Sequence, residues 1–178
     1  TDSQYSANVA ATAAGGFPLA AAAWTVNAGT MTVVKATDSP SQNVTVGASD
    51  VPLAKYTFTA NGEKIKVETL RVGIITLGGD VTTNTLRNVR LMVNGAQVGS
   101  TTSVPAAAAF AAAAGTSFTT NFHVSPGTPA TVEIRADIFD NEGVNDIAAG
   151  TTTSVQALLV GGVGTSNAVP SVALGTIN

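Results

Sequence analysis

The residues best suited to do chemistry lie in one acidic segment, 135–146, with the sequence RADIFDNEGVND. Its carboxylates at Asp140, Glu142 and Asp146 accompany a glycine, and hard oxygen ligands of this kind are those that Ca²⁺ prefers. Their spacing does not match an EF-hand loop, and acidic turns between strands are common. We therefore expect a solvated turn here and no cofactor, with a calcium site at Asp140, Glu142 and Asp146 as the alternative.

No catalytic constellation accompanies this segment. His123 is the single histidine and cysteine is absent, so His123 as a base would need a nucleophile and an acid from elsewhere. As a metal ligand it would lack histidine partners. It alternates with Phe122 and Val124 on an expected strand, which favours a structural or interface role. The glycine stretches LGGD and VGGVG do not follow the strand–GxGxxG–helix pattern, so we expect no catalytic residue and no enzyme.

The distribution of charge is unusual. Charged residues make up 11% of the 178-residue chain, against about 25% in an ordinary soluble protein. They are absent between Asp2 and Lys35, between Arg90 and Glu133, and after Asp146. Because interface cores are depleted of charge, we expect these segments to face other protein. The alternative is that scarce charge leaves long gaps by chance.

Composition also excludes two classes of partner. The chain has eight basic residues and a net charge of -3, which leaves no basic stripe for nucleic acid. No stretch approaches about 18 consecutive apolar residues, so we expect no membrane insertion of the mature chain.

Alternation of apolar and polar residues predicts an all-β chain. Segments 55–61 and 131–139 alternate strictly, which is typical of half-buried antiparallel strands. In 63–75 the apolar set moves by one residue partway along. A β-bulge near Glu68 or Thr69 would absorb this change of phase.

A hairpin and several shorter strands complete the expected fold. Asn94-Gly95 supplies the two positive-φ residues of a type I′ turn between alternating strands. Further strands are expected at 29–36, 43–48, 116–124, 153–160 and 169–174. Seven to ten short strands with turn signals between them indicate an antiparallel β-sandwich rather than an α/β fold.

Four stretches carry a family resemblance: LAKYTFTANGEKIKVETLRVGI, LRNVRLMVNGAQVG, TVEIRADI and VPSVAL. Over about 29–174 the chain resembles the Ig-like β-sandwich modules of bacterial cell-surface proteins, which form surface layers, stalks and filaments. The resemblance implies an Ig-like sandwich and an extracellular structural or adhesive role. We expect a sandwich domain over 29–178, an uncharged N-terminal extension over 1–28, and an alanine-rich insertion at 104–115.

The extension has the pattern of a strand that could be given to a neighbour. Small apolar residues alternate along it, at Tyr5, Ala7, Val9 and Ala11. Such a segment could add to the sheet of the next subunit, where main-chain hydrogen bonds supply affinity and side-chain pockets supply register.

Two alanine runs add thin, uncharged surface. The first ends at Trp24, and the second, VPAAAAFAAAAG, contains Ala108, Phe110 and Ala112. Alanine favours helix over strand, so for 104–115 we favour a short helix or an irregular loop slightly over a strand. An uncharged segment is poorly solvated, so we expect a neighbouring subunit to cover it.

These observations favour a self-assembling extracellular structural subunit: a filament, a pilus-like fibre, a tube or a surface layer. Its partners would be copies of itself, and it would reach the cell surface after removal of a signal peptide. The alternative is an adhesive or glycan-binding module of a cell-surface protein, which would be a monomer with an exposed aromatic platform.

Overall fold

The structure, a computed structural model, describes residues 21–25, 28–77, 85–107, 115–140, 154–166 and 172–173. Within these ranges the chain forms nine β-strands and no helix, so the expected all-β class is confirmed. The strands are β1 (Thr30–Lys35), β2 (Val51–Asn61), β3 (Ile65–Leu77), β4 (Thr85–Val93), β5 (Ala96–Ala107), β6 (Thr116–Val124), β7 (Ala130–Asp140), β8 (Ser154–Thr165) and β9 (Val172–Ala173).

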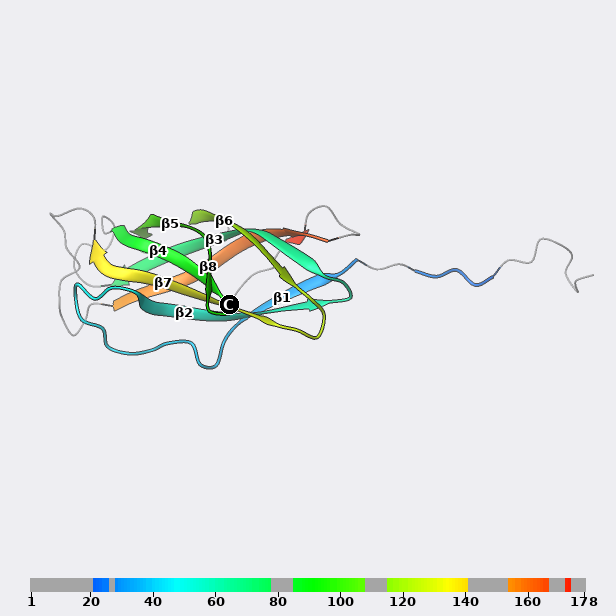
Figure 1. The fold of residues 1–178 in the computed structure, drawn as a ribbon, viewed down its shortest axis with the longest axis horizontal. Coiled ribbons are helices and arrows are strands. Elements are labelled where there is room, and N and C mark those ends of the chain that lie inside the picture. The colour runs from blue at the N-terminus through cyan, green and yellow to red at the C-terminus, as the bar shows by residue number, and fades with distance from the viewer. Residues whose placement is uncertain are drawn as a thin grey trace, which may run out of the picture.

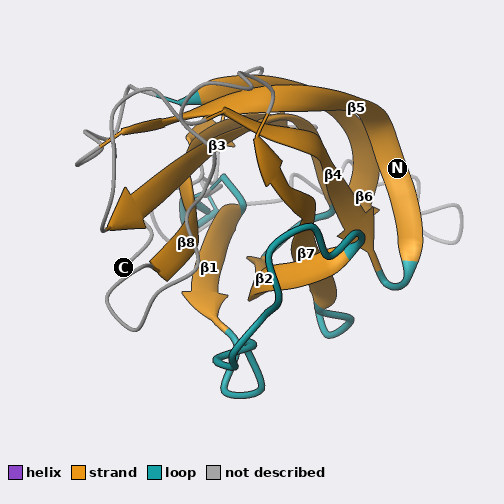
Figure 2. Ribbon diagram, turned by 90° about the vertical axis from the view of Figure 1, so that its left-hand side faces the viewer, coloured by secondary structure: helices purple, strands orange, loops and turns teal. Residues whose placement is uncertain are grey.

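The strands form one curled sheet, in which the order is β1-β2-β7-β4-β5-β3-β8-β9 and β6 pairs with β3. All pairs are antiparallel except β3 with β5. Figure 1 shows the strands running roughly along the long axis, and Figure 2 shows them curling around that axis. β5 links the two parts of the curl because it pairs with β4 along most of its length and with β3 at Ala106 and Ala107.

The core fills the inside of the curl. On β2, the side chains of Tyr56, Phe58 and Ala60 are buried, as the alternation predicts. On β7, every second side chain from Val132 to Ile138 is buried, also as predicted. Each fully buried large apolar side chain contributes about 1.5–3 kcal/mol, so this continuous inner face supplies most of the driving force for folding.

β3 has a change of phase at the predicted place. Ile65 and Val67 point into the core before it, and Leu70, Val72 and Ile74 point into the core after it. The register of β3 shifts between residues 67 and 69 against both β6 and β8. This confirms the predicted β-bulge.

A buried hydroxyl satisfies the backbone beside this bulge. A bulge disrupts the ladder locally, and a buried carbonyl without a partner is costly. Thr120 is one of two buried polar residues of the described core, and its hydroxyl donates to the carbonyl of Val67 at 3.1 Å. β6 therefore stabilises the bulge through a side chain as well as through strand pairing.

The predicted hairpin is also present, between β4 and β5. Asn94 has φ 49° and Gly95 has φ 84°, the two positive values that a type I′ turn requires. The turn is tied to β7, because the Asn94 N–H donates to the Thr131 carbonyl and the Asn94 Oδ1 accepts from the Thr131 N–H, each at 2.9 Å.

Two local predictions were wrong. The expected strand at 43–48 is not formed; instead, Gly47 and Ala48 exchange two backbone hydrogen bonds with Ile138 of β7, at 2.7 and 2.8 Å. The helix or loop expected from residue 104 is absent at 104–107, which end β5 as a strand. There Val104 and Ala106 enter the core, and tertiary pairing outweighs the helix preference of alanine.

We predict that Thr120→Val destabilises the protein by about 1–2 kcal/mol, because it leaves the Val67 carbonyl buried without its hydroxyl donor. The free energy of unfolding in urea measures this. Thr119→Val is the matched control, since Thr119 is the exposed neighbour on β6 and such surface changes stay within about 0.5 kcal/mol. Equal stabilities of the two variants would contradict the role given to Thr120.

Candidate functional site

Strand alternation places a group of polar side chains on the outer face of β3, β6 and β8. Residues 65 and 67 of β3 point inward, so Lys66 between them points outward. Strand pairing puts Lys66 directly opposite His123 of β6 on one side and Thr165 of β8 on the other. Lys64 precedes β3, and Ser166 follows β8.

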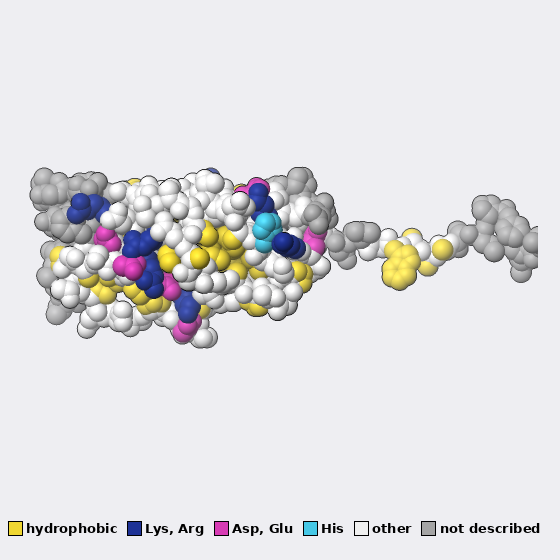
Figure 3. Space-filling view, in the orientation of Figure 1, with side chains coloured by type: hydrophobic (Ala, Val, Ile, Leu, Met, Phe, Trp, Pro, Cys, Tyr) yellow, Lys and Arg dark blue, Asp and Glu magenta, His cyan; other side chains and the backbone are white. Residues whose placement is uncertain are grey.

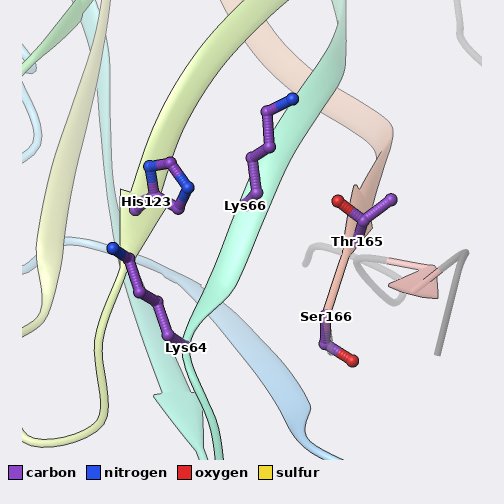
Figure 4. Close-up of a pocket in the computed structure, with 5 residues that line it drawn as sticks. All are labelled: Lys64, Lys66, His123, Thr165 and Ser166. Atoms are coloured by element: carbon purple, nitrogen blue, oxygen red, sulfur yellow. The ribbon is translucent and has the colours of Figure 1, made fainter. Parts of the chain in front are cut away.

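These five residues line a shallow cup of about 390 Å³, near the small end of the range for ligand pockets. In Figure 4 the Lys64 side chain points toward His123, while the ammonium of Lys66 points away from both. That ammonium lies 3.1 Å from Oε1 of Glu68, and the same oxygen lies 3.4 Å from the Thr165 hydroxyl, which donates to it. The cup therefore has a cationic end and a hydroxyl-rich side.

The chemistry of the cup suits binding more than catalysis. Lys64 and His123 make no ion pair with a described residue, and β6 and β8 contain no carboxylate. The Thr165 hydroxyl donates to Glu68 rather than to His123. The arrangement presents positive charge and hydrogen-bonding groups to a ligand from solvent.

A second set of charged residues lies on the β2, β4 and β7 side of the sheet, and there opposite charges form ion pairs with one another. Asp50 pairs with Arg90, and its Oδ2 lies 3.0 Å from Nη1 of Arg135. Asp137 accepts hydrogen bonds from the Asp50 N–H at 2.9 Å and from the Asn88 amide at 2.5 Å. Figure 3 shows this group well separated from the histidine and its lysines, with largely uncharged surface between them.

The environment of this network lowers the pKa of both aspartates. Burial by itself raises the pKa of Asp50, but hydrogen bonds from Arg90 and Arg135 bring it below the ordinary value of 3.8. Burial also raises the pKa of Asp137, but the hydrogen bonds from the Asn88 side chain and the Asp50 N–H lower it below the ordinary value. The network therefore holds the segment before β2 to β4 and β7 as long as both carboxylates are ionised.

The residues predicted for function are not brought together by the described part of the structure. Trp24 is 92% exposed, in a segment that extends away from the strands (Figure 1), and Asp140 is the last residue of β7. The other predicted residues lie outside the described ranges: Tyr5, Ala7, Val9, Ala11, Ala108, Phe110, Ala112, Glu142 and Asp146. The calcium site stays a prediction. Among the described residues, no three His, Cys, Asp or Glu side chains are grouped to hold a metal.

Sequence reasoning missed the cup. It treated His123 as a single histidine on a strand face and gave no role to Lys64, Lys66, Thr165 or Ser166. The needed signal was the register that places 66, 123 and 165 in one row, and separate strand patterns do not contain it.

Within the described ranges, no helix is of a length and apolarity that would cross a bilayer.

We predict that Asp137→Asn lowers the free energy of unfolding by about 1–2 kcal/mol near neutral pH, because an amide there would set its NH₂ against that of Asn88. The folded-state pKa of Asp137 lies below its unfolded value, so its contribution is present above the unfolded pKa and is lost as pH falls through the folded pKa. The difference in Tm from wild type should therefore shrink as the pH falls below about 4, the unfolded pKa of an aspartate, and on through the lower folded pKa.

Asp38→Asn is the control for this titration. Asp38 pairs with Lys55 at the surface, and exposed ion pairs contribute little, so its Tm should follow wild type at every pH. A Tm difference for Asp137→Asn that does not change with pH would contradict the electrostatic explanation.

Known proteins supply no further constraint: no protein-family model, no curated protein and no solved structure matches this chain.

Proposed function

We propose that this chain is a self-assembling extracellular structural subunit, an Ig-like β-sandwich domain that builds a filament, a pilus-like fibre, a tube or a surface layer from copies of itself. The observation that carries this proposal is the outer edge of β1, with which no other strand of the described ranges pairs. The scarcity of charge and its confinement to two windows of the sequence support it.

The first five residues of β1 lack the features that normally prevent strand addition, and the one charge of the strand is at its last residue, Lys35. β1 pairs with β2 in unbroken register from Thr30 to Lys35, and no described strand pairs with its other side. Edge strands are commonly protected by charge, proline, bulges or short length. Thr30–Val34 contains no charge and no proline, and the side chain of Val34 is 50% exposed. Such an edge is a template for another strand.

The far end of the strand path lies near this edge. β1 and β9 approach each other, but β9 pairs with β8 only at Val163 and Gly164. Tyr56, the partner of Lys35 on β2, spans the core here, and its buried hydroxyl accepts a hydrogen bond from the Leu159 N–H of β8 at 3.2 Å. This side chain thus joins β2 and β8, the strands next to the two ends of the strand order, at one point. Added backbone could join the two ends over a longer stretch.

The strand proposed to add here is the alternating segment Tyr5, Ala7, Val9 and Ala11 of a neighbouring copy. Its backbone would complete the β1 ladder, and its small side chains would follow the alternation of the sheet. Contact between one copy's extension and the next copy's edge is heterologous, and it produces a filament when it does not close into a ring. The exposed Trp24 and the alanine run with Ala108, Phe110 and Ala112 are proposed as further contacts.

Deletion of residues 1–12 tests the donor strand. We expect this variant to keep the far-UV circular dichroism and Tm of wild type, because the described core contains none of these residues. Electron microscopy of the purified protein should show polymers for wild type and none for the deletion. Polymers of normal length from the deletion variant would refute the proposed donor strand. Monomeric wild type would favour the adhesive-module alternative.

Val34→Lys tests the acceptor edge independently. Lysine on an edge strand is a common protection against strand addition, so we expect the critical concentration for polymerisation to rise roughly tenfold or more, equivalent to about 1.4 kcal/mol. Val44→Lys is the matched control, because Val44 is similarly exposed but lies outside the strands. Sedimentation of the polymer measures both, and equal effects of the two variants would argue against β1 as the acceptor.

A further inference from the structure

We propose that the cup lined by Lys64, Lys66, His123, Thr165 and Ser166 binds an acidic saccharide, whose carboxylate or sulfate group lies between Lys64 and His123. This site is on the outer face of the sheet and does not require that the chain polymerises. The proposal therefore goes beyond the assembly function.

The cationic end of the cup has unused charge. Other described basic side chains are neutralised by a carboxylate: Lys55 pairs with Asp38, and Arg90 pairs with Asp50. Lys64 makes no ion pair with a described residue and is exposed, and its side chain points toward His123 (Figure 4). A single oxyanion at this point would meet the Lys64 ammonium and a ring N–H of His123, and these are charge-assisted hydrogen bonds when the histidine is protonated.

The neighbouring side of the cup suits the hydroxyl groups of a sugar. The Thr165 hydroxyl donates to Glu68 at 3.4 Å and can still accept from a sugar hydroxyl, and Glu68, which also accepts from Lys66 at 3.1 Å, is a further acceptor at the rim. Among the described residues, no apolar side chain lines the cup. A ligand that has one acidic group and several hydroxyls matches this division better than a free inorganic anion, which would leave the hydroxyl side unused.

The surroundings argue against a polyanion such as nucleic acid. The chain has a net charge of -3, and the positive end of the cup is one small area formed by Lys64 and His123, because β6 and β8 contain no lysine or arginine. Phosphate backbones bind through several spaced basic residues. A saccharide with isolated acidic groups needs only one such point per repeat.

Isothermal titration calorimetry with a hyaluronan oligosaccharide tests the proposal. A neutral maltooligosaccharide and inorganic sulfate are the comparison ligands. We expect a Kd on the order of 1 mM for the hyaluronan oligosaccharide, weaker binding at high salt, and no measurable binding of the neutral sugar. Equal affinity for the neutral sugar, or binding of inorganic sulfate as tight as that of the oligosaccharide, would overturn the assignment to an acidic saccharide.

Point variants locate the site. Lys64→Ala and His123→Ala should each weaken binding roughly fivefold, the effect of losing one partly exposed ion pair. Lys35→Ala removes an exposed lysine from β1 and should leave the affinity unchanged. Both cup residues are exposed, so Tm should not move. Equal affinities of Lys64→Ala and Lys35→Ala would overturn the site. We expect Lys64→Ala and His123→Ala to polymerise like wild type, so a loss of saccharide binding in these variants is distinguishable from a loss of assembly.

Discussion

The fold depends on the double pairing of β3. This strand bonds to β8 on one side and to β6 and then β5 on the other, so a change of phase in its apolar residues has to be absorbed within the ladders. The bulge between Val67 and Thr69 does this, and the Thr120 hydroxyl satisfies the carbonyl beside it. Without the bulge, either Ile65 and Val67 or Leu70, Val72 and Ile74 would face solvent.

The same constraint builds the outer surface. Before the bulge, Lys66 alternates with the core side chains Ile65 and Val67, and the register with β6 and β8 sets Lys66 between His123 and Thr165. The candidate binding cup therefore follows from the way the core is packed. Its polar groups come from three strands whose inner faces are held together by the apolar side chains of the core.

Charge divides the molecule into parts with different roles. Around Asp50 and Asp137, opposite charges neutralise one another and hold a loop to the sheet. At the cup, positive charge is left for a ligand. Along Thr30–Val34 of β1 there is no charge at all, and an uncharged, regular edge favours the addition of another strand. A chain with few charged residues can thus combine a stable core, a surface site and an edge open to assembly.

The sequence by itself determined the all-β class, the alternating core of β2 and β7, the bulge near Glu68 and the turn at Asn94-Gly95, because each is a local pattern of side-chain period or backbone conformation. Tertiary structure alone decided that residues 104–107 form a strand, that 43–48 does not, and that β5 pairs in parallel with β3. It also decided the meeting of Lys64, Lys66 and His123 with Thr165 and Ser166. Strand order and register depend on pairing between distant segments, and the period of one strand cannot specify its neighbour.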